Sequence, residues 1–193
     1  MMNNNKNNNK PEKVQIKEEY AIVLDVVLEN QSSFSDNEVA QAIGTSGYTL
    51  LELVPKRDVI LKTGDKVYLG DGKRDEIQYI KKSLKQSELS NDAQLELEFA
   101  VAEIVKEKET EFVNFFNRAG PISIRKHSLE LVGGVGKKHL SDLMWERDKK
   151  PFESFEDITT RCPFLSHPAQ AVSKRIMDEI AGKDDFKFFT HNI

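Results

Sequence analysis

The stretch Leu129–Leu140 (LELVGGVGKKHL) constrains the fold of this chain most, because three glycines in four residues interrupt a helical pattern. Glycine permits positive φ angles and a close approach of a ligand to the backbone. A basic run begins at Lys137, so the amides before it are expected at a helix start, where unpaired N–H groups attract an anion. Val135 is expected to insert into the core. The stretch predicts a helical hairpin that holds a phosphate, with a purely structural hairpin as the alternative.

Composition limits the protein to one or two compact domains and restricts any nucleic-acid site to a local patch. The chain has 193 residues, a net charge of −4 and 31% charged side chains, so no global basic field surrounds it. Its single cysteine, Cys162, excludes an internal disulfide and a Cys-rich zinc site, and fits a cytoplasmic location. No apolar run is long enough to span a membrane and no signal-peptide core is present, so no membrane partner is expected.

The first part of the chain predicts a small β-barrel. Residues 1–13 are rich in Asn and Lys and are expected to form a disordered tail. Over residues 14–85, β-rich runs alternate with turn signals, which is typical of an OB-like or SH3-like barrel, and whether that barrel binds a ligand stays open. A cap at Ser35-Asp36-Asn37 predicts a short helix that runs through Ala42. The predicted strands are 20–28, 48–54, 58–61, 66–69 and 76–80.

An acidic helical connector is predicted over residues 86–120. Its residues 86–111 carry eight acidic and two basic side chains, a balance of −6. Ser90 is an N-cap signal that precedes apolar residues at helical spacing, and a second helical pattern covers Glu107 to Arg118. The clustered carboxylates are interpreted as a solvated helix face rather than as a metal site.

Positive charge gathers around the glycine hairpin. Residues 121–150 carry seven basic and four acidic side chains, a balance of +3, where a contact to phosphate needs it. The hairpin helices are predicted at Ile122–Val132 and Lys137–Lys149, and Trp145 in the second helix is expected to anchor a packing face. The predicted nucleic-acid-binding residues are Gly133, Gly134, Val135, Gly136, Lys137, Lys138, Arg125, Lys126, His139 and Arg147.

The run LVGGVGKK from Leu131 to Lys138 resembles the hairpin of the helix–hairpin–helix family, which grips the sugar–phosphate backbone of nucleic acids without reading sequence. It departs from that family at Gly133, where proline is preferred. The run PFESFEDI at residues 151–158 resembles the connector between tandem hairpins, so Cys162–Ser166 stands where a second hairpin belongs, without its glycines. A helix is predicted to follow at Pro168–Ala181. The resemblance implies an all-α helix–hairpin–helix domain over residues 121–193, with a degenerate, structural second hairpin.

A wider set of motifs is spread over residues 19–189. They are Glu19-Tyr20-Ala21 with Val23-Leu24-Asp25, Leu50–Lys56, Val67–Gly70, Phe112–Pro121, Leu129–Leu131 through Lys137-Lys138, and Pro151–Ile158. Together they resemble an uncharacterised archaeal family labelled as RNA-binding proteins. The resemblance implies an α+β fold in which an N-terminal small OB-like β-barrel precedes the helix–hairpin–helix domain. RNA is favoured over DNA as the partner, and ribosomal or rRNA-processing proteins are candidate protein partners.

Three functions are compatible with these features. The first is a non-catalytic nucleic-acid-binding protein without a cofactor. The second is a DNA-repair glycosylase or nuclease, for which Asp157 is the candidate acid; it is interpreted instead as a carboxylate at a helix start, and the four histidines show no metal-ligand spacing. The third is a protein-interaction scaffold in a ribosome- or DNA-repair-associated complex. We expect no catalytic residue, no metal and no enzyme activity.

Overall fold

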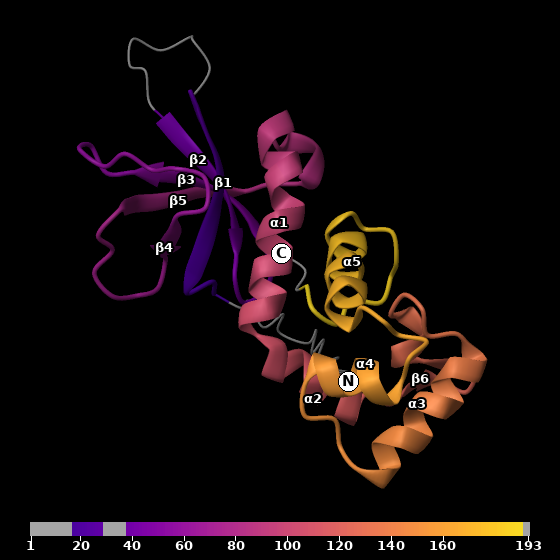
Figure 1. The fold of residues 1–193 in the computed structure, drawn as a ribbon. Helices are drawn as coiled ribbons and strands as arrows, with labels where there is room; N and C mark the ends of the chain where they lie inside the picture. Colours follow the sequence, from indigo (N-terminus) through magenta and orange to yellow (C-terminus); the bar gives the residue numbers. More distant parts are fainter. Residues whose placement is uncertain (1–16, 29–37, 191–193) are drawn as a thin grey trace, which may run out of the picture.

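The computed structural model describes residues 17–28 and 38–190, which form an α+β protein (Figure 1). Within these residues, a curled five-stranded antiparallel sheet is followed by a layer of helices that contains a small two-stranded sheet. The strands of the large sheet are β1 (Tyr20–Leu28), β2 (Glu38–Gly44), β3 (Leu50–Pro55), β4 (Lys66–Tyr68) and β5 (Ile77–Ser83). The remaining elements are η1 (Gln86–Glu88), α1 (Asn91–Glu107), α2 (Glu109–Arg118), β6 (Pro121–Ser123), β7 (Lys126–His127), η2 (Ser128–Leu131), α3 (Lys137–Lys149), α4 (Phe155–Arg161) and α5 (Pro168–Ile180).

The large sheet has the strand order β4-β1-β2-β3-β5. A register shift in β1 between Val23 and Asp25 marks a bulge, and a bulge bends a strand and increases its twist. The curl gathers one apolar cluster from all five strands, including Val23, Leu53 and Ile77. The opposite face of β1 and β2 is also buried, against α1. Burial on both faces explains the nearly continuous apolar run of β1.

Two sequence predictions for the sheet are wrong. Residues 38–42, expected at the end of a short helix, belong to β2, where Ala42 pairs with Val23 of β1. Residues 58–61, expected as a strand, form none, although Leu61 is buried. The fifth strand is therefore β2. The predicted tail (residues 1–13) and the cap at Ser35-Asp36-Asn37 lie outside the described residues.

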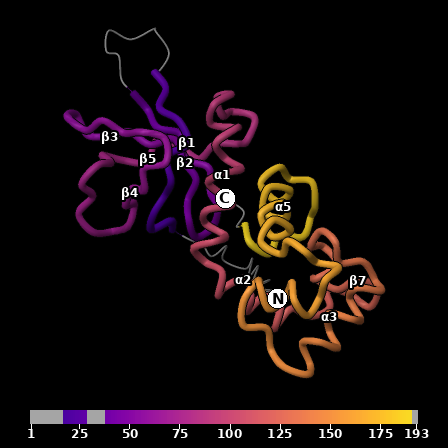
Figure 2. Tube along the Cα trace, viewed as in Figure 1, coloured from indigo at the N-terminus to yellow at the C-terminus, as the bar shows by residue number. Residues whose placement is uncertain are grey.

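Helix α1 stands between the sheet and α5, as Figures 1 and 2 show. It begins at the predicted cap, where the Ser90 hydroxyl accepts a hydrogen bond from Ala93 N–H at 3.0 Å. The same hydroxyl donates to the Asp25 carboxylate at 2.6 Å and so joins the start of α1 to β1. Leu97 and Val101 are fully buried along the helix, while its carboxylates face outward. The acidic helix is confirmed, and its apolar face belongs to the main core.

The predicted first hairpin helix, Ile122–Val132, is wrong. The segment forms the β6–β7 ribbon and the short 3-10 helix η2. Ser128 donates its hydroxyl to the Gly120 carbonyl at 2.6 Å, and Glu130 accepts the His127 N–H at 2.7 Å. Short polar side chains that bond to nearby backbone offer it an alternative to the helix ladder. The second hairpin helix is confirmed as α3.

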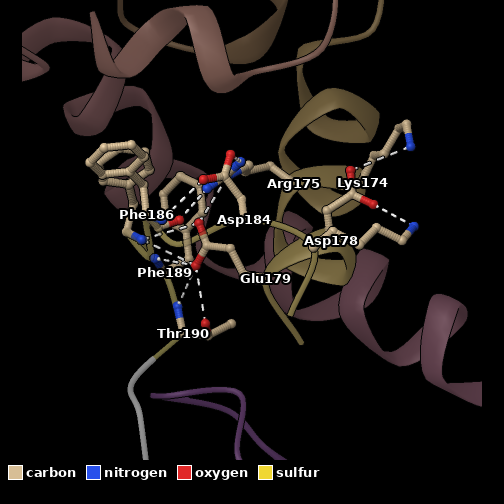
Figure 3. A network of polar contacts seen from close by, with 10 residues as sticks. Lys174, Arg175, Asp178, Glu179, Asp184, Phe186, Phe189 and Thr190 are labelled. Atoms are coloured by element: carbon tan, nitrogen blue, oxygen red, sulfur yellow. Dashed lines mark hydrogen bonds and ion pairs between the residues drawn. The ribbon is translucent and has the colours of Figure 1, made fainter. Parts of the chain in front are cut away.

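Residues 183–190 return along α5 without forming a strand. The buried carboxylate of Glu179 accepts hydrogen bonds from the N–H groups of Phe188, Phe189 and Thr190 at 2.9–3.1 Å. Figure 3 shows this cluster with the Arg175 guanidinium, whose Nε lies 3.0 Å from Glu179 Oε1. Phe189 packs on Phe115 of α2 at 4.9 Å between ring centroids. One carboxylate therefore fastens this segment between α5 and α2.

Candidate nucleic-acid interface

The glycine turn connects η2 to α3 and is closed by one backbone hydrogen bond. Val135 N–H donates to the Val132 carbonyl at 3.2 Å, and both valine side chains are buried as expected for Val135. Gly134 has a φ of +88°, whereas Gly133 and Gly136 lie outside the left-handed region. A Cβ at Gly134 would lie 3.4 Å from Leu165 Cδ1, whereas Gly133 and Gly136 face open space. Only the central glycine is therefore required by the turn.

The start of α3 leaves backbone donors free at the surface. Gly136 is the N-cap and supplies no side-chain cap, and the first bond of the helix runs from Leu140 N–H to the Gly136 carbonyl at 2.8 Å. Within the described part of the chain, the N–H groups of Lys137, Lys138 and His139 have no hydrogen-bond partner. The positive end of the helix dipole and these donors favour an anion.

The two lysines at this helix start are exposed cations. Across residues 17–28 and 38–190, no carboxylate pairs with Lys137 or Lys138. Their charges therefore remain available to an anion that approaches the free amides.

Two further predicted residues lie beside this helix start. Arg125, from the turn between β6 and β7, and Lys126, the first residue of β7, line an open pocket of about 310 Å³ together with Lys137 of α3. The carboxylate of Glu130 also borders this pocket. Lys126 Nζ lies 5.2 Å from the ring centroid of Phe186. The structure thus gathers three of the predicted cations around one hollow.

His139 supports the turn. Its Nδ1 lies 2.9 Å from the Gly134 carbonyl oxygen, and its ring stacks on Phe164 with centroids 4.3 Å apart and planes 12° apart. Phe164 belongs to the turn between α4 and α5. The imidazole therefore braces one turn against the other and is only partly open to a ligand.

The turn between α4 and α5 repeats the construction of the glycine turn. Leu165 N–H donates to the Cys162 carbonyl at 2.9 Å, as Val135 N–H does to Val132, and Leu165 is buried to the same extent as Val135. Pro168 occupies the first turn of α5 and has no N–H to offer. The second turn keeps the backbone hydrogen bond and lacks the glycines.

Arg147 lies away from the hairpin surface. Its Nη1 donates to the carbonyls of Phe116 at 3.3 Å and Ala119 at 2.9 Å, at the end of α2. The side chain is 14% exposed. Arg147 therefore closes the C-terminus of α2 and does not join the lysines of the glycine turn.

Sequence reasoning missed three features near this surface. It placed no β-ribbon at residues 121–127, and it expected Trp145 to anchor packing, whereas the indole is 64% exposed. It also missed the reciprocal cap of η2, in which Leu129 N–H donates to His127 Nδ1 at 3.2 Å. Burial, and next the Arg147 guanidinium, lower the pKa of His127. The spacing of His127 and Glu130, three residues apart, was the available signal for the cap.

The remaining candidates for chemistry are engaged in structural contacts. Asp157 accepts from Arg161 Nη1 at 3.1 Å and from Glu153 N–H at 3.1 Å, at the Ser154-capped start of α4. Cys162 is fully buried, and burial raises the pKa of its thiol to about 11. Of the residues that the structure describes, no three His, Cys, Asp or Glu side chains cluster as a metal site would require. No described helix is both long and apolar enough to cross a membrane.

Comparison with known proteins places the chain in a family. The family model described as "Protein of unknown function (DUF655)" matches residues 17–191. The uncharacterized protein MJ0038 of Methanocaldococcus jannaschii is 36% identical over 181 residues, which cover 94% of this chain and 81% of that protein. The crystal structure of Af1531 from Archaeoglobus fulgidus superposes with a TM-score of 0.82 at 36% identity, covering 90% of this chain and 99% of the other. These relatives are archaeal, and the chain belongs to the DUF655 family.

Proposed function

We propose that this protein binds the sugar–phosphate backbone of nucleic acids, without catalysis, at the turn formed by residues 133–138. One observation carries the proposal: three free backbone N–H groups at the start of α3 lie beside two exposed lysines that have no acidic partner in the described chain. Such donors and cations fix a phosphate in position and do not read bases.

The architecture supports the same proposal. Two turns share the same backbone hydrogen bond, Val135 to Val132 and Leu165 to Cys162, and a helix follows each of them, as in the second half of a helix–hairpin–helix motif. The strand order β4-β1-β2-β3-β5 agrees with a partly open barrel of the OB type. Both likenesses concern the fold, and a fold does not determine a function. The free amides and the two lysines are the chemical basis for phosphate binding.

The charge-reversed variant Lys137→Glu/Lys138→Glu tests the proposal. Fluorescence anisotropy would compare structured RNA, single-stranded RNA and duplex DNA, each at several salt concentrations. Binding is expected to weaken as salt rises, because bound phosphates release counterions, and the variant should lose about two units of the salt slope. The ranking of the three nucleic acids separates RNA from DNA, and we expect RNA to rank first.

The matched control is Lys62→Glu/Lys106→Glu, which changes the net charge by the same amount at exposed lysines outside the turn. We expect the control to bind as the wild type does. Equal loss in both variants would indicate a general charge effect, and affinity that does not change with salt would contradict a phosphate clamp. Thermal unfolding of each variant checks that it is folded.

A second candidate function, a protein-interaction scaffold, has one observation in its favour. Leu95 and Phe99 lie one turn apart on α1 and are 71% and 69% exposed. The carboxylates of Glu96 and Glu98 are next to them in the chain and suit a basic partner. Co-purification with a protein partner that survives nuclease treatment and is lost in Leu95→Ser/Phe99→Ser would favour this function over the first.

A further inference from the structure

The indole of Trp145 is left in solvent in the middle of α3. It is the only tryptophan of the chain, and it is 64% exposed. The helix packs through a different face, on which Leu143 is fully buried and Leu140 is partly buried. Tryptophan is highly buried on average, so core packing does not account for this residue.

Trp145 shares a face of α3 with a lysine of the proposed phosphate site. Trp145 follows Lys138 by seven positions, which is nearly two full helical turns and roughly 10 Å along the helix axis. Lys149 falls on the same face by the same geometry, and Asp142 lies between the first two. A strand whose phosphate lies at the start of α3 would meet this indole as it follows the helix.

The indole is held in place from one side. Lys149 Nζ lies 3.0 Å from the ring centroid and 2.6 Å from Glu146 Oε1. Glu146 also faces Arg161, whose Nε lies 3.5 Å from Oε2. A cation on one face of an aromatic ring is a favourable arrangement, and the 64% exposure of the residue leaves ring surface open to a flat partner.

We propose that Trp145 stacks on an unpaired base of the strand whose phosphate lies at residues 133–138. This inference rests on the proposed function and adds the class of substrate: nucleic acid with an unpaired nucleotide next to the bound phosphate. Inside a duplex the faces of the bases are covered by their neighbours, whereas unpaired bases stack on aromatic side chains. Lys138 is exposed on the same face and has no acidic partner among the described residues, so its charge suits the strand, whereas Lys149 is already paired with Glu146.

Because Trp145 is the only tryptophan, the fluorescence of the wild-type protein reports on it directly. Three ligands of one length would be titrated: a single strand, the same strand in a blunt duplex, and the same strand with abasic sites in place of its bases. Fluorescence anisotropy would measure binding in parallel. We expect quenching by the single strand alone, although the abasic strand still binds through its phosphates.

Variants separate stacking from charge. Trp145→Ala should weaken single-strand binding by about 5- to 100-fold, as expected for one stacked base, and leave duplex binding unchanged. Trp145→Phe should retain most of the affinity. Tyr79→Ala removes an exposed aromatic from β5, outside both proposed surfaces, and serves as the control, for which no change is expected.

The failures of the two proposals are distinguishable. A single strand that binds through Lys137 and Lys138, with unchanged fluorescence and equal affinity in Trp145→Ala, would overturn the stacking and leave the phosphate site intact. No binding of any of the three ligands would overturn both. Quenching on addition of a protein, with none on addition of nucleic acid, would make the indole a protein contact and would also overturn the inference.

Discussion

Gly134 packs against Leu165, so that the two turns of the helical layer touch. The position of a Cβ at Gly134 lies 3.4 Å from Leu165 Cδ1 and 4.0 Å from the carbonyl oxygen of Phe164. The stacking of His139 on Phe164 lies at the same junction. The geometry of the proposed phosphate site therefore depends on a second turn that lies 30 residues later and is not itself a candidate for binding.

Replacing Gly134 by alanine should destabilise the protein by about 1–2 kcal/mol, because a non-glycine residue is strained at a φ of +88°. Urea unfolding would measure the loss. Gly133→Ala is the control: its Cβ meets no atom within 4 Å and its φ is not positive, so its stability should be unchanged or slightly raised. Equal destabilisation of both variants would contradict the assignment of the turn to Gly134.

Replacing Glu179 by glutamine should cost about 3 kcal/mol, because it leaves the buried Arg175 without its closest carboxylate. The control is Asp178→Asn, whose side chain is 27% exposed and pairs with Lys183 and Lys174 at the surface. We expect a change below about 1 kcal/mol there. Denaturant unfolding of both variants provides the comparison, and a Glu179 variant as stable as the wild type would show that the buried cluster is dispensable.

Cys162 should resist alkylation in the folded protein. Burial, and next the Glu146 carboxylate, raise the pKa of the thiol to about 11, so little thiolate forms at pH 8. Labelling with iodoacetamide should be slow in buffer and fast in urea, and the single cysteine makes mass spectrometry unambiguous. Rapid labelling without denaturant would show that the α4–α5 turn opens readily.

His127 should make the protein less stable in mild acid. Burial and the Arg147 guanidinium lower its pKa below the ordinary 6.5, against an opposing effect of Glu130. The unfolded chain then binds the proton more readily, so the free energy of unfolding falls as pH drops below about 6.5 and levels off below the folded-state pKa. Urea midpoints of the wild type and His127→Gln across pH 5–8 isolate this effect from that of the carboxylates. If the midpoints of the two proteins change with pH in parallel, His127 does not contribute to the loss of stability in acid.

Local signals predicted the parts of the fold that local bonds create. The predicted Ser90 cap begins α1, because its hydroxyl accepts the N–H of Ala93, three residues later. The helix start at Lys137 follows from the glycine at its N-cap. The prediction failed for strand β2 (EVAQAIG), because Ala and Gln suit a helix. Only the pairing with β1 and β3 makes this segment a strand.

The same distinction applies to the candidate site. The charge of Lys137 and Lys138 and the left-handed glycine could be found from the sequence, since both depend on neighbours in the chain. The role of Arg147 could not be found, because its carbonyl partners at the end of α2 lie 28 and 31 residues away in the chain. Trp145 was misjudged because tryptophan is highly buried on average, although helical spacing places it roughly 140–160° around the axis of α3 from Leu140 and Leu143.

The position of α1 has a consequence for cooperativity. One apolar cluster continues from Leu24 and Ile43 of the sheet through α1 to Val132 and Ile176 of the helical layer. Melting of either layer would expose the other layer's side of this shared cluster, so heat should produce one transition with equal calorimetric and van 't Hoff enthalpies. A sheet expressed without residues 86–120 would expose the face that α1 covers, and is expected to aggregate. The phosphate site would thus be lost together with the sheet, although no residue of the sheet belongs to it.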